Sequence, residues 1–405
     1  MNAVVLGNGR SGRSAADVLR REGASVTVLD GEDAWPSDVT FDLCVTSPGI
    51  ALDHPWQIAA RAADVPVVSE LQLGAERWRA RGGRMLAVTG SKGKSSVVKL
   101  VAEALLSAGT PAVPCGNYGL PLCQVVLDRP DPEGAWAVVE VSSFQMETTT
   151  LPADAFVAAA VLNLQEDHLD RHGSADVYHG LKRRLLEMAE VRICGDSLPD
   201  GLGREGRALL SGSYFDNPVL RTNGLCAVAV LRAAGLADPA IAAAFAAFSP
   251  LPHRMQRVRT TDGLRWIDDS KATSLAALSA GILMATGEKG DKCLLIAGGL
   301  AKGDDPKSVI PHLRSGVKKV YLIGRCADQF ADAWRETVPC ALCGTLDHAV
   351  AAARRDACPG ETVLLSPGTA SFDQFKSYGA RGDMFAALAR GGAEGDVAEA
   401  SKRGR

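Results

Sequence analysis

The residues best suited to chemistry lie in one segment, Gly90-Ser91-Lys92-Gly93-Lys94-Ser95-Ser96. Its glycines would let the backbone approach a phosphate, and N–H groups at the start of a following helix would point at the anion. Lys94 would contact the β- and γ-phosphates of a nucleotide, and the Ser95 hydroxyl would join a Mg²⁺ shell. The spacing differs from the common Walker form, because the position five before Gly93 is Val88 rather than glycine. An ordinary Gly-rich turn with two surface lysines is the alternative.

A second glycine-rich motif, Gly7-Asn8-Gly9-Arg10-Ser11-Gly12, follows the first expected strand, and Asp30 ends the second. A GxGxxG pattern with an acidic residue about twenty positions further on is typical of NAD sites. A nicotinamide oxidoreductase is therefore a competing hypothesis. The pattern itself requires only a pyrophosphate at a helix N-terminus, which any sugar-diphosphate nucleotide also offers. Two nucleotide-phosphate sites in one chain favour ATP in one domain and a nucleotide-tagged substrate in another.

The elements that must position these motifs are short apolar runs alternating with helical stretches, which predicts βαβ units and parallel sheets. The strand over 85–89 runs into the Gly90 loop and a helix over about 95–108, as a phosphate-binding loop requires. Arg79–Arg84 predicts a linker, the stretch 192–217 is expected to be irregular, and Ser249–His253 predicts a Pro-rich break. Further strands are expected over 3–6, 25–29, 41–45, 135–141, 155–162, 292–296, 319–323 and 362–365.

These elements predict an α/β fold, and a chain of 405 residues is too long for one typical domain. We expect three domains. An N-terminal Rossmann-like domain is expected over 1–84, a central P-loop ATPase-like parallel sheet over 85–250, and a C-terminal Rossmann-like domain over 251–405.

Composition argues against several functional classes. With 46% hydrophobic and 22% charged residues, the chain is typical of a globular protein. A formal charge of −3 supplies no basic field for nucleic acid or for an anionic membrane. No signal peptide or long apolar run is visible, so we expect a cytoplasmic protein whose ten cysteines are reduced. The single CxxC pair, Cys340 and Cys343, lacks the second pair of a typical zinc site.

Further motifs follow one another in a fixed order. They are GNYGLP at 116–121, EVSSFQ at 140–145, NLQEDHLDR at 163–171, YHGLK at 178–182, LPHR at 251–254, WIDDSKAT at 266–273 and LSPGTASFDQFK at 365–376. This series resembles the Mur ligases of peptidoglycan synthesis, and the resemblance runs from Val4 to about Leu388. Within that family, the SSFQ, EDHLDR, DSKAT and SFDQFK segments are most similar to the members that add D-glutamate.

The resemblance implies an ATP- and Mg²⁺-dependent amide ligase that acts as a monomer on UDP-N-acetylmuramoyl-L-alanine and glutamate. ATP would phosphorylate the substrate carboxylate to an acyl phosphate, which the glutamate amine attacks to form an amide and release phosphate. Positioning and charge neutralisation supply most of the catalysis of phosphoryl transfer, and the acyl transfer needs a stabilised oxyanion. Three alternatives stay open beside the oxidoreductase: a ligase for L-glutamate or another amino acid, a folylpolyglutamate synthase, and an inactive binding module.

Glu140 ends an expected strand and His168 follows an acidic pair, so both can reach a cation at the mouth of a parallel sheet. By resemblance, Glu140 and Ser95 bind one Mg²⁺ and His168 helps to bind a second. Lys182 alone would be interpreted as one more base on a solvated helix face. In the family the lysine at this place is carbamylated, which replaces an ammonium with an anion able to bridge two metals. Lys94, Glu140, His168 and Lys182 form the implied catalytic set.

The resemblance also implies three sets of binding residues, one for each domain's ligand. ATP would be held by Gly90, Ser91, Lys92, Gly93, Lys94, Ser95, Ser96, Asn223, Arg254 and Asp269. The UDP-substrate would be held by Arg10, Ser11, Asp30, Ser47, Asn117, Ser142, Ser143 and Gln145. The glutamate pocket would consist of Lys271, Thr273, Lys302, Ser371, Phe372 and Tyr378, where a lysine with hydroxyls suits a carboxylate.

Three departures from the family pattern stand out. The central domain is shorter than expected between Lys182 and Asn223. Of the family's HNxxN segment near adenine, the sequence over 218–223 keeps only Asn223. Gly31 and Glu32 follow Asp30 where the family often has Thr-Arg. None of these departures removes an implied metal ligand or the loop lysine, so catalysis is expected to survive.

Overall fold

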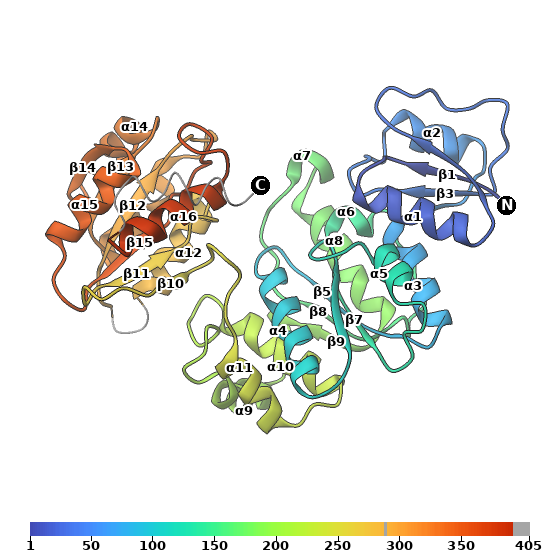
Figure 1. Cartoon of the computed structure of the whole chain (residues 1–405), viewed down its shortest axis with the longest axis horizontal. Coiled ribbons are helices and arrows are strands. Elements are labelled where there is room, and N and C mark those ends of the chain that lie inside the picture. The colour runs from blue at the N-terminus through green and yellow to red at the C-terminus, as the bar shows by residue number, and fades with distance from the viewer. Residues whose placement is uncertain (287–289, 392–405) are drawn as a thin grey trace. The chain divides into compact units, whose positions relative to one another are not determined.

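The computed structural model describes residues 1–286 and 290–391, and it contains three sheets (Figure 1). The chain divides into two compact units. One consists of residues 1–216 and 220–248, and the other of residues 217–219 and those from 249 onward. Within the described ranges, no helix is long and apolar enough to cross a lipid bilayer.

The first sheet is fully parallel, with the strand order β2-β1-β3-β4. Its strands are β1 (Asn2–Leu6), β2 (Ser25–Leu29), β3 (Leu43–Thr46) and β4 (Val67–Ser69). Its helices are α1 (Arg10–Arg21), α2 (Pro55–Ala62) and α3 (Glu70–Ala80). Alternate residues of β1 enter different cores, because successive side chains of a strand point to opposite faces. Val4 and Leu6 join Trp56 of α2, whereas Ala3 and Val5 join α1.

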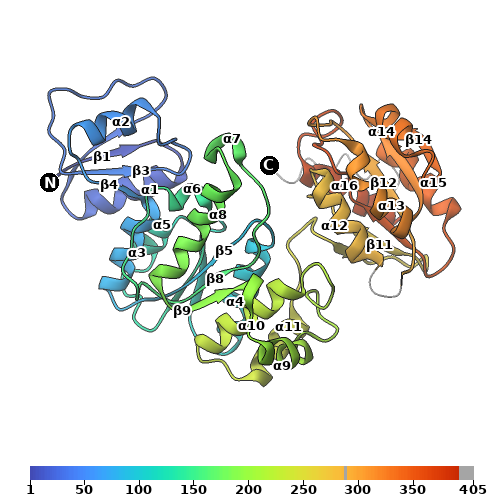
Figure 2. The same ribbon diagram turned by 180° about the vertical axis from the view of Figure 1, so that it is seen from behind.

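The second sheet is also fully parallel, with the order β6-β7-β5-β8-β9. Its strands are β5 (Arg84–Thr89), β6 (Ala112–Gly116), β7 (Trp136–Glu140), β8 (Phe156–Val161) and β9 (Ala189–Cys194). Its helices are α4 (Lys94–Ser107), α5 (Leu122–Asp128), α6 (Ser143–Met146), α7 (Leu169–His172), α8 (Ala175–Arg184), η1 (Leu185–Met188), η2 (Gly195–Ser197), α9 (Asp200–Leu210), α10 (Arg221–Ala233) and α11 (Asp238–Ala247). Helices α4 and α10 contact each other and the sheet (Figure 2).

One hydrophobic core joins the first two sheets. It contains Ala3 and Val5 of β1 and also Met85 and Ala87 of β5, with α1, α3 and α5 between them. Trp78 of α3 is fully buried in this core. Because burial of apolar surface is the main favourable term in folding, the two sheets stabilise one another. This shared core explains why they fall in one compact unit.

The third sheet has the order β10-β11-β15-β12-β13-β14, and only the edge strand β10 is antiparallel. Its strands are β10 (Gln256–Val258), β11 (Arg265–Asp268), β12 (Cys293–Gly298), β13 (Val317–Ile323), β14 (Cys340–Gly344) and β15 (Thr362–Leu365). Its helices are α12 (Leu275–Thr286), η3 (Pro306–Val309), α13 (Ile310–Gly316), α14 (Ala327–Trp334), α15 (Leu346–Asp356) and α16 (Tyr378–Ala389). Separate apolar clusters cover its two faces, one with α12, α13 and α14 and the other with α15 and α16.

Two local predictions are wrong in their extent. The expected linker Arg79–Arg84 is shorter than predicted, because α3 continues to Ala80 and β5 begins at Arg84, so that residues 81–83 connect them. The stretch 192–217 is not irregular throughout, since β9 extends to Cys194 and α9 covers Asp200–Leu210. Glycines at 201, 203 and 206 lower the helix propensity of α9, and packing of α9 against α10 and α11 outweighs that cost.

Candidate functional site

The Gly90 loop lies between β5 and α4, in the context that the sequence predicts. Gly90 and Gly93 adopt φ values of 147° and 86°, a backbone region that glycine enters at little steric cost. A Cβ on Gly93 would also lie 2.1 Å from Asn223 Nδ2. Lys94 Nζ donates hydrogen bonds to the carbonyls of Gly90 and Ser91 at 2.7 and 3.2 Å. The loop thus places a lysine and the first N–H groups of α4 together, an arrangement suited to phosphate.

Residues beyond the loop hold its shape, and Asn163 is the main one. Its side chain accepts from the Lys92 N–H and donates to the Lys92 carbonyl, both at 2.9 Å. The same amide donates to Asn223 Oδ1 at 2.9 Å, so Asn223 supports the loop through Asn163. The Ser91 hydroxyl donates to the Gln165 carbonyl at 2.9 Å. The sequence prediction names Asn223 for its expected contact with ATP and does not include Asn163 or Gln165.

Glu140 stands at the carboxyl end of β7, where it pairs in register with Val88 of β5. Its side chain is buried, and its Oε1 accepts a 2.7 Å hydrogen bond from Asn117 Nδ2. Its Oε2 is also buried and has no hydrogen-bond partner among the described residues. A buried carboxylate oxygen without a partner is costly unless a cation or a donor reaches it. Glu140 therefore fits a role as a ligand of Mg²⁺, and Asn117 orients it.

Lys182 of α8 is 1% exposed, unlike the solvated base that its sequence context suggests. Its Nζ lies 3.4 Å from the Thr89 hydroxyl and 4.6 Å from the centre of the Tyr178 ring. Burial lowers the pKa of Lys182 to about 7, and the nearby charge of Lys94 acts in the same direction. A large fraction of this amine is therefore neutral near pH 7, which is the nucleophilic form.

His168 immediately precedes α7, as its N-cap residue, with a left-handed φ of 53°. Its ring packs against Phe144 at a centroid distance of 4.9 Å and lies 6.2 Å from the ring of Tyr178. About half of the side chain is exposed, so a ligand can reach it. In the described ranges, no three His, Cys, Asp or Glu side chains gather in a group that could hold a metal ion.

Ser142, Ser143 and Gln145 make contacts within the protein. Ser142 and Gln145 form a capping box at the start of α6, in which each side chain bonds the other's backbone N–H. The pattern Ser-x-x-Gln is a recognised signal for such a box. Ser143 is buried, and its hydroxyl lies 3.0 Å from His172 Nε2. These residues shape the turn that follows Glu140.

Four of the residues expected to hold the UDP-substrate, Arg10, Ser11, Asp30 and Ser47, lie near the Gly7 motif in the first sheet. Gly7 has a φ of 89°, and a Cβ on Gly12 would lie 1.8 Å from the Gly7 carbonyl. The Asn8 N–H donates to Asp30 Oδ1 at 3.4 Å, and the Ser47 hydroxyl lies 3.5 Å from the Gly7 carbonyl. Arg10 and Ser11 begin α1, and Arg10 also donates to the Gly119 carbonyl at 3.2 Å.

In the second unit, the expected residues other than Arg254 follow the carboxyl ends of the adjacent strands β11, β15 and β12, and Arg254 precedes β10. Lys271 lies 4.2 Å from the centre of the Tyr378 ring. Burial and the positive charges of Arg254 and Lys302 lower the pKa of Lys271. Such a gathering of cations at the end of a parallel sheet suits an anionic ligand. Ser371 is buried, whereas Phe372 is 70% exposed and Thr273 is half-buried.

Asp269 is buried in this unit and accepts hydrogen bonds from the Ser366 hydroxyl at 2.9 Å and the Met255 N–H at 3.2 Å. Burial raises the pKa of Asp269 from 3.8 to about 7. Between these values the folded chain holds a proton that the unfolded chain lacks, so Asp269 makes stability fall as the pH rises from about 4 to about 7. We expect Asp269→Asn to flatten this part of the curve, measured by urea unfolding of both proteins at pH 5 and pH 7.5. An unchanged difference between the two pH values would contradict the assignment.

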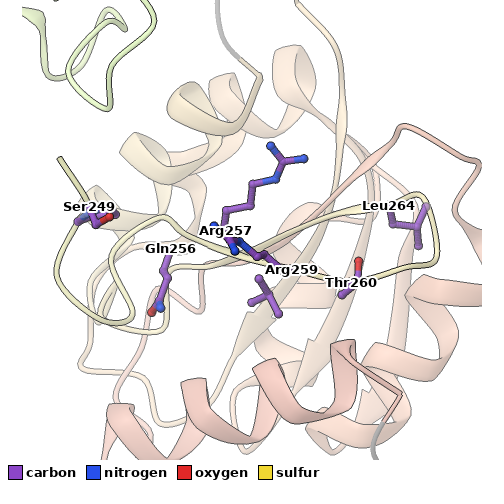
Figure 3. A pocket seen from close by; sticks show the side chains of 8 residues that line it. Ser249, Gln256, Arg257, Arg259, Thr260 and Leu264 are labelled. Carbon is purple, nitrogen blue, oxygen red and sulfur yellow. The ribbon is translucent and has the colours of Figure 1, made fainter. Parts of the chain in front are cut away.

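A separate hollow of about 660 Å³ lies beside the edge strand β10 (Figure 3). Arg257 and Arg259 line it, together with Ser249 and Leu264. None of the residues expected to bind ATP, UDP-substrate or glutamate lines this hollow.

Comparison with known proteins identifies the family of this chain. Residues 88–194 match the model of the Mur ligase middle domain, and residues 253–368 match that of the Mur ligase glutamate ligase domain. The chain is 36% identical to the UDP-N-acetylmuramoylalanine–D-glutamate ligases of Frankia casuarinae and Sphingopyxis alaskensis. These matches cover 96% and 95% of this chain, and 88% and 95% of the relatives. The chain belongs to the Mur ligase family.

Solved structures of Mur ligases and related enzymes share the fold. The MurF ligase of Thermotoga maritima, solved with ADP, has a TM-score of 0.59 at 14% identity, covering 99% of this chain and 95% of that one. FolC of E. coli, also solved with ADP, has a TM-score of 0.53 at 18% identity, covering 82% of this chain and 94% of that one. Membership in the Mur ligase family favours the ligase hypothesis over the nicotinamide oxidoreductase.

Proposed function

We propose that this Mur ligase uses ATP to join D-glutamate to UDP-N-acetylmuramoyl-L-alanine, as a monomer in the cytoplasm. The observation that supports it best is the proximity, at the carboxyl ends of β5 and β7, of the Gly90 loop, the buried Lys182 and a Glu140 oxygen that has no partner among the described residues. Its relatives of 36% identity, which carry the name of D-glutamate ligases, match almost the whole chain.

In this proposal, residues of the first unit bind the ATP phosphates, the UDP-substrate and Mg²⁺, and they support phosphoryl transfer. The N–H groups of the Gly90 loop and Lys94 hold the phosphates of ATP, and the Gly7 motif holds the diphosphate of the UDP-substrate. Glu140, Ser95, His168 and a carbamylated Lys182 would hold Mg²⁺, which neutralises phosphate charge when it is bound. Asn117 keeps the Glu140 carboxylate in place through its 2.7 Å hydrogen bond.

The residues of the second unit bind the incoming amino acid and the rest of ATP. Lys271 and Lys302, with Thr273, Ser371, Phe372 and Tyr378, form the proposed glutamate pocket, since their cations suit its carboxylates. Arg254 approaches the phosphates of ATP, and Asp269 accepts from the ribose hydroxyls. The buried Asp269 carboxylate keeps acceptor capacity beside its two donors, because each of its oxygens has two lone pairs.

A phosphate-release assay with UDP-N-acetylmuramoyl-L-alanine, ATP and Mg²⁺ tests this proposal. We expect turnover with D-glutamate that exceeds turnover with L-glutamate by at least about a hundredfold, because a pocket built for one stereoisomer leaves polar groups unpaired with the other. The Lys94→Ala variant is the control and should release little phosphate. Turnover with L-glutamate or another amino acid, and none with D-glutamate, would reject the proposed specificity. Turnover that persists in Lys94→Ala would reject the role of the loop.

A further inference from the structure

A continuous line of polar contacts runs from the first sheet to the turn after Glu140. It starts at the carbonyl of Ile50, passes through Arg171 and Glu147, and continues through His172 to Ser143. We call Arg171, Glu147, His172 and Ser143 the Arg171 network. No member except Ser143 belongs to the expected binding or catalytic residues.

Arg171 makes the strongest contacts of this network. Its Nε and one terminal nitrogen donate to the two oxygens of Glu147 at 3.0 and 2.6 Å. That terminal nitrogen also donates to the Ile50 carbonyl at 3.0 Å. The side chains of Arg171 and Glu147 are only 18% and 6% exposed. A forked, charge-assisted pair of this kind has a defined geometry, which a lysine could not reproduce.

The other end of the network is fully buried. His172 Nδ1 lies 3.4 Å from Glu147 Oε1, and its Nε2 lies 3.0 Å from the Ser143 hydroxyl. The two ring nitrogens of His172 thus face a carboxylate on one side and a hydroxyl on the other. The order Ser143, His172, Glu147 is that of a nucleophile, base and orienting acid. With only 2% of the residue exposed, however, Ser143 is buried against the protein, which favours a positioning role over attack on a substrate.

Both ends of the network meet residues expected to bind ligands. The Ile50 N–H donates to the Ser47 carbonyl at 3.0 Å. The hydrogen bond from Arg171 to the Ile50 carbonyl therefore also fixes the turn that carries Ser47. A Cβ on Gly7 would contact both Ser47 and Ile50, which places this turn against the Gly7 motif. Ser143, at the other end, is itself expected to bind the UDP-substrate. Between the two ends, the Arg171 guanidinium lies 5.2 Å from the centre of the Phe144 ring, and Phe144 packs against His168.

We propose that Arg171 is a positioning residue that sets the 47–50 turn of the UDP-substrate site against α6 and α7 through Glu147. This inference rests on the proposed function, because it assigns the 47–50 turn to the UDP-substrate. It predicts that loss of the fork weakens binding of the UDP-substrate and leaves the ATP site, which the Gly90 loop and Asn163 hold, almost unchanged.

The test compares Arg171→Lys with Arg77→Lys. Arg77 forms an equally forked pair with Glu22, at 3.1 Å for both bonds, in the same unit and without contact to the expected site. For Arg171→Lys we expect the KM for UDP-N-acetylmuramoyl-L-alanine to rise about tenfold and the KM for ATP to change less than about twofold. Titration calorimetry with UDP alone should show a similarly weaker Kd. Arg77→Lys should leave all three quantities unchanged.

Glu147→Gln provides a second and independent probe, since it keeps the shape of the side chain and removes its charge. It should raise the same KM, and the double variant should be little worse than either single one, because both changes break one pair. Equal KM values for Arg171→Lys and the wild type would overturn the inference. A similar rise in Arg77→Lys would show a general loss of stability instead. If the wild type shows no ligase turnover but binds UDP, and Arg171→Lys weakens that binding, the proposed function is rejected. The positioning role of Arg171 is then supported.

Discussion

Lys182→Ala is expected to lose at least about a hundredfold in ligase turnover, comparable to the loss of one preorganised group that stabilises a transition state. Lys182 is buried beside Thr89 and Tyr178, and burial lowers its pKa to about 7. The neutral amine can add to CO₂: nitrogen bonds to carbon, one proton leaves, and a carbamate anion results. Beside Glu140 and the Gly90 loop, this anion would supply the second negative charge that two metal ions require.

A short carboxylate should partly replace that anion. We therefore expect added acetate or formate to restore part of the turnover of Lys182→Ala and to leave the wild type unaffected. Arg183→Ala is the matched control, since Arg183 is the next residue on α8 and is exposed. Turnover is measured by phosphate release at equal protein concentration, with melting curves to verify folding. Full activity of Lys182→Ala without any additive would refute the carbamate hypothesis.

Gly93→Ala is expected to reduce turnover by about a hundredfold, because a shift of the loop of the order of 1 Å suffices for such a loss. An alanine there would keep a φ of 86° only at a cost, and its Cβ would lie 2.1 Å from Asn223 Nδ2. Asn223 would have to break its hydrogen bond with Asn163. Asn163 in turn forms hydrogen bonds with both the N–H and the carbonyl of Lys92. We expect the KM for ATP to rise together with the fall in kcat.

Gly109→Ala separates the effect of the contact from that of the backbone. Gly109 follows the other end of α4 with a φ of 80°, and a Cβ there would meet no atom of the described part of the chain within 4 Å. Both alanines therefore carry similar backbone strain, about 1 kcal/mol. Only Gly93→Ala should affect kcat and the KM for ATP, whereas both variants should lower the melting temperature, Gly93→Ala by the larger amount because of its added contact with Asn223. Equal kinetic losses in both variants would show that backbone strain alone disturbs the loop.

The sequence allowed the prediction of features that depend on local pattern and on the geometry of parallel sheets. The strand before Gly90 and the helix after it are confirmed, and so is the place of Glu140 at a strand end. The resemblance to Mur ligases is confirmed by the family models and by relatives of 36% identity. The roles of the individual site residues stay predictions.

Contacts between distant segments could not be predicted in the same way. The support of the Gly90 loop by Asn163 depends on β8 lying next to β5, and no local pattern marks an asparagine for this task. Burial of Lys182 depends on how α8 packs, and its neighbours Arg183 and Arg184 suggested a solvated face. The capping box of Ser142 and Gln145, by contrast, could have been predicted from its Ser-x-x-Gln spacing.

The core shared by the first two sheets bears on how such a chain can change in evolution. A domain joined to its neighbour by a flexible linker can be exchanged between related proteins, because few of its side chains contact the neighbouring domain. Here the apolar faces of α1, α3 and α5 serve both sheets at once. Genetic recombination near Gly83 would join a first sheet and a second sheet from different proteins. Their side chains would not have evolved to pack against one another. Evolutionary change in the Gly7 motif is therefore constrained by the packing of α1, α3 and α5 against the sheet that carries the Gly90 loop.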